Sequence, residues 1–277
     1  MNKIKNIALF FNTFRGIHVF EKIKSNYKIK IFLSTKYLDK KVENYLKRKK
    51  VPFTKISNLK NKILEKNLKQ IDLGISCGFS LIFDEKILKK IKYGIINCHA
   101  GKVPEYRGGS PLNWQLINNE KKFGISVLKI KKGIDNGEII EQKKFPIKKN
   151  YNIDTLHKIA NLNFPKMIKK SLKKIESGKK FIKQNEKKAK LWPQRSWVDS
   201  LFNPVKKTNF QIIKIIYACR KPYEAFFLKN KILYKIYSAE LNAIKLKPGQ
   251  LKNANKKILL GCLKGSIAIK KYKKIYL

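Results

Sequence analysis

The first half of the chain alternates short apolar runs with basic amphipathic stretches, and this alternation restricts the possible folds more than any other feature. Four apolar runs have the length of buried strands, namely Asn6–Phe11, Lys28–Leu33, Leu73–Ser76 and Ile95–Asn97. Helical spacing of apolar residues occupies the stretches between them, at 17–25, 39–49, 59–69 and 84–91. This order predicts an α/β fold with a Rossmann-like, mostly parallel sheet and helices on both of its faces.

The second half of the chain predicts an additional, smaller domain. Strands are expected at 123–130 and 137–146, followed by a long Lys-rich helix over 155–177. Residues 183–190 are polar and charged, and a helix over 209–219 and several short apolar segments follow them. We therefore expect one domain over residues 1–190 and a small strand-rich C-terminal domain over residues 191–277.

Charge is the most unusual property of the composition. Lys and Arg total 65 against 18 Asp and Glu, which gives a formal net charge of +47. Such an excess is typical of proteins that bind polyanions. However, only five of the basic residues are Arg, and the Lys residues are spread over the whole chain among many Ile and Asn. We interpret the charge chiefly as codon composition, so we do not infer nucleic-acid binding from it.

The cysteines and the apolar segments indicate neither a metal site nor a membrane span. Cys77, Cys98, Cys219 and Cys262 occur singly, without the paired spacing of a zinc site or a disulfide framework, so buried, reduced thiols are expected. The first apolar run is shorter than the core of a signal peptide. No run reaches the roughly 18 apolar residues of a membrane-spanning helix. We expect a cytoplasmic protein that holds no metal.

Polar residues that can carry chemistry follow the fourth apolar run. Asn97 and His99 are two residues apart, so on a strand their side chains point to the same side. They stand at the C-terminal end of a predicted parallel strand, where open α/β sheets place their sites. A turn-rich loop with Gly101, Pro104, Arg107, Gly108, Gly109 and Pro111 comes next. Further on, Gly133–Gly137 (GIDNG) presents Asp135 between two glycines, which allow close approach of the backbone to a ligand.

These segments resemble the signatures of the N10-formyltetrahydrofolate-dependent formyltransferases. Residues 97–108 (NCHAGKVPEYRG) resemble the family pattern N-x-H-x-S-x-x-P-x-Y/W-R-G, and residues 133–137 resemble its G-x-D-x-G. Gly101 departs from the pattern, since many members carry Ser there, and this departure affects loop detail. Residues 217–226 and 248–269 look like degenerate versions of segments from the family's C-terminal domain. The resemblance thus extends over most of the chain.

The resemblance implies a catalytic trio of Asn97, His99 and Asp135. Formyl transfer to an amine needs stabilisation of the negative oxygen of a tetrahedral intermediate, for which the amide of Asn97 is suited. An imidazole exchanges protons near neutral pH, so His99 could take the proton of the amine and return one to the leaving nitrogen. Asp135 could orient His99 or relay a proton through water. None of these steps needs a metal.

The resemblance also suggests binding residues. Folate-binding backbone groups are expected in the loop after the Leu73–Ser76 strand and at one glycine, namely Cys77, Gly78, Phe79, Ser80, Leu81, Ile82 and Gly133. A nucleotide needs an aromatic platform and cations at its phosphates. Candidates for substrate binding are Asn12, Thr13, Arg107, Trp192, Tyr217, Arg220 and Tyr223.

Two acceptors fit the resemblance, a nucleotide-linked amino sugar and the aminoacyl end of initiator methionyl-tRNA. The tRNA-type enzymes usually carry an inserted basic loop after the second strand, and residues 32–41 contain no long insertion. The segment from Trp192 also looks short for an RNA-binding barrel, while residues 111–114 and 117–124 resemble the sugar enzymes more. We therefore favour the sugar nucleotide, of the dTDP-4-amino-4,6-dideoxyglucose type, in surface polysaccharide synthesis by a homodimer. Methionyl-tRNA formyl transfer stays as the alternative, and the nucleotide and the position of the amino group stay open.

A third interpretation is a basic nucleic-acid-binding protein that keeps the signature by descent alone. Such a protein would be expected to have lost at least one of the three catalytic residue types. Because all three are intact, we place this interpretation last.

Overall fold

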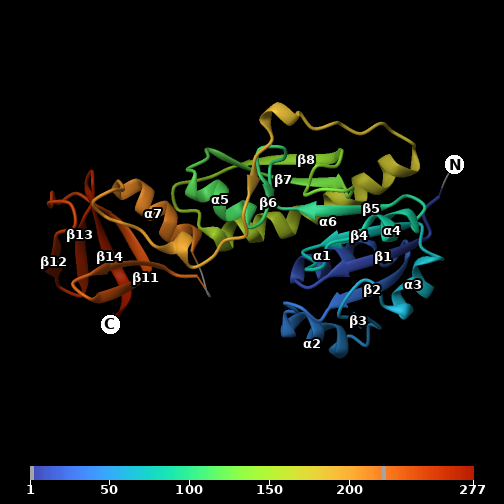
Figure 1. Ribbon diagram of the computed structural model, residues 1–277, viewed down its shortest axis with the longest axis horizontal. Helices are drawn as coiled ribbons and strands as arrows, with labels where there is room; N and C mark the ends of the chain where they lie inside the picture. The colour runs from blue at the N-terminus through green and yellow to red at the C-terminus, as the bar shows by residue number, and fades with distance from the viewer. Residues whose placement is uncertain (1–2, 220–222) are drawn as a thin grey trace. The chain divides into compact units, whose positions relative to one another are not determined.

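A computed structural model describes residues 3–219 and 223–277 of the protein (Figure 1). Two compact units are present. The first contains the chain up to Gly108, Gly124–Phe145 and His157–Leu191. The second contains Gly109–Phe123, Pro146–Leu156 and the chain from Trp192 onward. The division into domains at residues 190 and 191 stays a prediction.

A seven-stranded sheet organises the first unit. Its order is β3-β2-β1-β4-β5-β7-β8. The strands are β1 (Asn6–Phe11), β2 (Lys28–Ser34), β3 (Thr54–Ile56), β4 (Leu73–Cys77), β5 (Ile95–His99), β7 (Lys122–Lys129) and β8 (Ile139–Pro146). Neighbours from β3 to β5 are parallel, and β7 runs antiparallel to β5 with Ser126 opposite His99. The expected mostly parallel sheet is confirmed.

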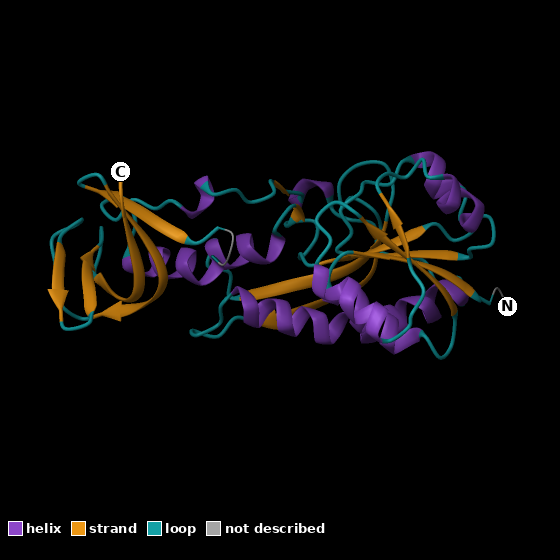
Figure 2. Cartoon of the chain, turned by 90° about the horizontal axis from the view of Figure 1, so that it is seen from below, coloured by secondary structure: helices purple, strands orange, loops and turns teal. Residues whose placement is uncertain are grey.

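Helices cover both faces of this sheet, as Figure 2 shows. The residues of β1 alternate between the faces: Ala8 and Phe10 pack in one apolar cluster with residues of α3 and α4, while Phe11 lies against Gly16 of α1. The helices of this unit are α1 (Phe14–Ile23), α2 (Lys40–Arg48), α3 (Lys62–Leu68), α4 (Glu85–Lys89) and most of α6 (Ile153–Glu176). Helix α5 (Pro111–Ile117) belongs to the second unit. This confirms the predicted α/β class with helices on both faces.

The order of the strands creates a switch point between β1 and β4. The chain runs from β1 outward to β3 and then returns to β4 on the other side of β1. In open α/β sheets, ligands bind beyond the carboxyl ends of the strands at such a point. The polar segments that follow β1, β4 and β5 therefore deserve the closest inspection for function.

The second unit contains a five-stranded antiparallel sheet, which confirms the expected strand-rich C-terminal part. Its order is β10-β11-β14-β13-β12. The strands are β10 (Ala225–Lys229), β11 (Ile232–Asn242), β12 (Leu251–Ala254), β13 (Lys257–Gly261) and β14 (Ser266–Tyr276). Helix α7 (Asn209–Ala218) begins with a capping box between Thr208 and Gln211 and buries its isoleucines against this sheet.

Short segments complete the chain. The two-residue strands β6 (Arg107–Gly108) and β9 (Leu191–Trp192) pair with each other. Single 3₁₀ turns, η1 (Glu186–Lys188) and η2 (Val198–Ser200), lie on either side of β9. Within the described ranges, no helix is long and apolar enough to cross a membrane.

All four cysteines are free and buried, as expected. Burial raises the pKa of the Cys262 thiol to about 11 and raises the pKa of the Cys98 thiol well above its ordinary value. Because the thiolate is the reactive form, we expect the native protein to react very slowly with a thiol-specific disulfide reagent. Unfolding in guanidinium should release all four thiols. Rapid labelling of the native protein would contradict the buried placement.

Candidate active site

One carboxylate contacts both polar side chains of β5. The Nδ2 group of Asn97 donates a hydrogen bond to Oδ1 of Asp135 at 3.3 Å. Atom Nδ1 of His99 lies 3.3 Å from Oδ2 of Asp135. Asn97 and His99 point to the same side because they are alternate residues of one strand, so a single acidic side chain reaches both. The structure therefore brings the three predicted catalytic residues together.

The imidazole of His99 is buried, with 6% of its surface exposed, and is held at both nitrogens. Its Nε2 atom lies 2.6 Å from the carbonyl oxygen of Tyr106, opposite the contact of Nδ1 with Asp135. Both neighbours are hydrogen-bond acceptors, so only the doubly protonated ring can donate to both. The ring is thus fixed in orientation by a contact at each nitrogen.

The conformation of the Gly133–Gly137 loop requires a glycine at each of its ends. Gly133 has φ +105°, and a Cβ atom on Gly137 would lie 1.7 Å from the carbonyl oxygen of Lys129. Between them, Asp135 adopts φ +47°. The tight turn against β7 carries the Asp135 carboxylate back toward β5, where the backbone N–H of Gly108 also donates to Oδ2 at 3.0 Å.

Gly101, the departure from the family pattern, lies directly against the imidazole. A Cβ atom at this position would stand 2.3 Å from Nε2 of His99 and 2.3 Å from the carbonyl oxygen of Tyr106. The departure thus affects the surroundings of His99 itself as well as the detail of the loop. A serine would require the backbone at Tyr106 to move.

The segment that follows β4 has the form expected of a backbone-lined site. Gly78 has φ +67°, Phe79 and Leu81 pack half-buried against the core, and Ile82 is 89% exposed. Outside helices and strands, none of the described main-chain hydrogen bonds involves residues 79–83. Their N–H and C=O groups are therefore available to a ligand.

Two side chains of this predicted set face the protein. Cys77 is buried, and its Sγ atom lies 3.2 Å from Sγ of Cys98. The hydroxyl of Ser80 donates to the carbonyl oxygen of Lys36 at 2.7 Å. Gly133, the last of the predicted folate-binding residues, begins the loop of Asp135. These residues offer their backbone, and their assignment to a ligand stays a prediction.

Among the predicted substrate-binding residues of the first unit, two are engaged within the fold. The amide of Asn12 is buried and exchanges hydrogen bonds with the backbone of Ser34, each at 3.0 Å. Arg107 is 8% exposed and binds Glu186 through both of its Nη atoms. Thr13 is exposed beside Gly78. Of these three side chains, only that of Thr13 is open to a ligand without first breaking such contacts.

The other described members of the predicted substrate-binding set lie in the second unit. Trp192 stacks on Trp114 with ring centroids 5.2 Å apart. Tyr217 packs against the apolar core of this unit, and Tyr223 is 36% exposed. Arg220 lies outside the described residues. The substrate-binding role of all these residues stays a prediction.

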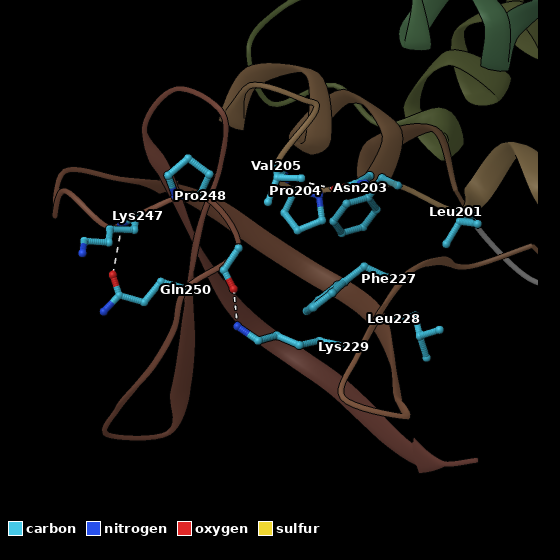
Figure 3. A pocket seen from close by; sticks show the side chains of 12 residues that line it. Leu201, Asn203, Pro204, Val205, Phe227, Leu228, Lys229, Lys247, Pro248 and Gln250 are labelled. Atoms are coloured by element: carbon cyan, nitrogen blue, oxygen red, sulfur yellow. Dashed lines mark hydrogen bonds between the residues drawn. The ribbon is translucent and has the colours of Figure 1, made fainter.

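Cavities occur in both units. The pocket in Figure 3 has a volume of about 610 Å³ and lies in the second unit between residues 201–205, β10 and residues 247–250. None of the predicted site residues lines it. In the first unit, a smaller cavity of about 390 Å³ is lined by Arg107, Ile134 and Asn136, which flank the candidate site. The described residues contain no cluster of three or more His, Cys, Asp or Glu that could hold a metal.

Gln184 contacts the loop of Asp135, although its sequence context gave little indication of a role in the site. Gln184 donates through Nε2 to the carbonyl oxygens of Asp135 at 2.7 Å and of Gly137 at 2.6 Å. Its position in the polar 183–190 stretch made it look like part of a linker. The only signal was a pair of neighbouring amides, Gln184 and Asn185, in a polar segment with no periodicity.

Comparison with known proteins gives one family and two kinds of relative. The sequence model of the formyl transferase family matches residues 25–169. A methionyl-tRNA formyltransferase of Caldanaerobacter subterraneus is 38% identical over 106 residues, which cover 38% of this chain and 34% of that protein. The corresponding enzyme of Orientia tsutsugamushi is 30% identical over 199 residues, which cover 69% of this chain and 62% of that protein. The chain thus matches about a third and about three fifths of these two relatives.

Among solved structures, the similarity extends over the whole chain. An N-formyltransferase from Helicobacter canadensis, determined in complex with folinic acid and dTDP-3-aminofucose, superposes with a TM-score of 0.76. It is 21% identical, and the alignment covers 97% of this chain and 100% of that chain. At this identity the likeness shows a shared fold.

Proposed function

Because the chain belongs to the formyl transferase family, we propose that it transfers the formyl group of N10-formyltetrahydrofolate to the amino group of a nucleotide-linked amino sugar. The observation that carries the transfer chemistry is the contact of one carboxylate, Asp135, with both Asn97 and His99. These are the residue types that the reaction needs: Asp135 lies 3.3 Å from each of Asn97 and His99, which stand at the end of β5.

Each residue of the trio has a distinct task. As the amine adds to the formyl carbon, its carbonyl oxygen gains negative charge, and the Asn97 amide donates a hydrogen bond to that oxygen. His99 accepts the proton that the attacking nitrogen loses and delivers a proton to the nitrogen that leaves, for which Nε2 exchanges its contact with the Tyr106 carbonyl oxygen for one with the substrate. Asp135 holds the imidazole in position through Nδ1. The products are the formamide and the deformylated folate, so atoms and charge balance.

The residues around the switch point fit a folate. A pterin is a flat ring with amide-like edges, so it needs backbone donors and acceptors together with an apolar surface. The unpaired backbone of residues 79–83 supplies the first, and the exposed side chain of Ile82 together with the half-buried ring of Phe79 supplies the second. N10-formyltetrahydrofolate supplies the formyl carbon when it is bound there.

Two observations support a sugar nucleotide as the acceptor. Strand β2 ends at Ser34 and helix α2 begins at Lys40, so the loop between them carries no long basic insertion. The fold also matches, over nearly its full length, an enzyme that was determined with a dTDP-linked amino sugar. We propose a dTDP-4-amino-4,6-dideoxyglucose or a close relative, formylated in the cytoplasm by a homodimer for a surface polysaccharide.

Initiator methionyl-tRNA is the second candidate acceptor. The two curated relatives described above act on it by name, at 38% and 30% identity. The net charge of +47 would then contribute to RNA binding. These matches cover only part of the relatives, so they support the family more strongly than the acceptor.

A single assay separates the two acceptors. Purified protein is incubated with N10-formyltetrahydrofolate and, in parallel, with dTDP- and UDP-linked amino sugars or with charged initiator tRNA at several salt concentrations. We expect one formyl group on a sugar nucleotide, detected by mass spectrometry, with a rate that depends weakly on salt. Formylation of tRNA alone, falling steeply as salt rises, would establish the alternative. Formylation of neither class would overturn the proposed function.

A further inference from the structure

We propose that Gln184 is a positioning residue for formyl transfer, because it holds the Gly133–Gly137 loop in the conformation that directs the Asp135 carboxylate toward His99. This inference rests on the proposed function of the site. Gln184 acts through Asp135, and the residues that hold Gln184 lie on β6 and in the segment after α6.

The loop needs an external hold because of its backbone conformation. Asp135 adopts φ +47°, a left-handed conformation that is unfavourable for a residue with a side chain. Such conformations persist where surrounding contacts determine them. Gln184 provides two such contacts, from its Nε2 to the carbonyl oxygens of Asp135 at 2.7 Å and Gly137 at 2.6 Å.

Arg107 fixes the orientation of the Gln184 amide. Its Nε donates to Oε1 of Gln184 at 3.0 Å, which leaves the NH₂ end of the amide to face the two carbonyl oxygens. The guanidinium is held in turn by Glu186, at 2.9 Å and 2.7 Å. Arg107 was predicted to bind substrate, and these contacts give its buried side chain a different task.

The contacts form a hydrogen-bond network that holds Asp135 at both its backbone and its side chain. The backbone N–H of Gly108 donates to Oδ2 of the Asp135 carboxylate at 3.0 Å, and Gly108 is the neighbour of Arg107 on β6. Asp135 is therefore held at its backbone through Arg107 and Gln184, and at its side chain by Gly108. Loss of Gln184 removes the hydrogen bonds to the backbone carbonyl oxygens of Asp135 and Gly137. The contacts of the Asp135 carboxylate remain.

The test is a double-mutant cycle between Gln184→Met and Asp135→Asn. Methionine has the length of glutamine but cannot donate a hydrogen bond. We expect Gln184→Met to lower kcat at least about tenfold, equal to about 1.4 kcal/mol, with little change in the KM of either substrate. In the Asp135→Asn background, Gln184→Met should cause almost no additional loss. Full additivity of the two losses would show that Gln184 does not act through Asp135 and would overturn the proposal.

Gln70→Met serves as the matched control, since Gln70 is an exposed glutamine of the same unit. Its kcat should equal that of the unmodified enzyme. If Gln184→Met does not fold, as judged by thermal unfolding, Gln184→Glu replaces it. A carboxylate keeps the contact with Arg107 but cannot donate to the two carbonyl oxygens, so the same loss is expected.

Hydrogen exchange separates this proposal from the proposed function. Peptides that contain residues 133–137 should exchange faster in Gln184→Met and at the original rate in Gln70→Met. Unchanged exchange in Gln184→Met would overturn the positioning role whatever the activity. An unmodified enzyme that formylates no acceptor would overturn the proposed function and leave the exchange result standing.

Discussion

His99→Asn is expected to lower kcat by about 10²–10⁴-fold, the usual contribution of a general acid–base group. The substitution removes the only group of the trio that can both accept the proton of the amine and deliver one to the leaving nitrogen. Asparagine still fills part of the buried position and can donate one hydrogen bond, so binding of folate and acceptor should change little. Steady-state kinetics with the acceptor identified in the assay above would measure both quantities.

A matched histidine controls for the substitution itself. His18 lies exposed on α1, and His18→Asn should leave kcat unchanged. Free imidazole added to the His99→Asn enzyme is expected to restore part of the lost rate, since it can carry the same protons. Near-normal turnover of His99→Asn would remove His99 from its acid–base role.

Asn97→Leu is expected to lower kcat by about 10²–10³-fold, the cost of removing one donor from a developing oxyanion. Leucine has nearly the shape of asparagine, and it removes the amide that donates to Oδ1 of Asp135. Because the donor matters most in the transition state, kcat should fall far more than the affinity for either substrate. Pre-steady-state measurement of one turnover would separate this chemical step from product release.

Asn253 provides the comparison, as an exposed asparagine on β12. Asn253→Leu should retain full activity. A rise in KM with unchanged kcat for Asn97→Leu would mean that Asn97 binds the ground state, and the oxyanion role would then be wrong.

Local patterns in the sequence were sufficient for most of the fold. Residues 7–11 are apolar throughout and buried on both faces of strand β1, so this strand follows directly from the sequence. Strand β3 has three residues and too few apolar positions to be seen. Strand β14 extends to Tyr276 because its second half, which is exposed and Lys-rich, pairs with β11. Pairing of this kind leaves little trace in the local sequence.

The residues of the site likewise fall into those that local sequence predicts and those that depend on tertiary contacts. Asn97 and His99 are alternate residues of one strand, so their common direction could be predicted from spacing alone. Their meeting with Asp135 came from the family resemblance, since a loop distant in sequence must fold back onto β5. Gln184 lies 49 residues beyond Asp135, and its task depends entirely on tertiary contacts. Arg107 shows the converse, because a cation next to a site was predicted to bind substrate and is neutralised by Glu186 within the fold.

The close approach at Gly101 has a consequence for how this chain can change over evolutionary time. The imidazole and the Tyr106 backbone occupy the volume that any larger side chain at residue 101 would need. A serine could return to this position only after a compensating shift elsewhere in the loop. The order in which substitutions occur around the site therefore decides which of them are tolerated. A substitution at residue 101 and the placement of His99 are epistatically linked.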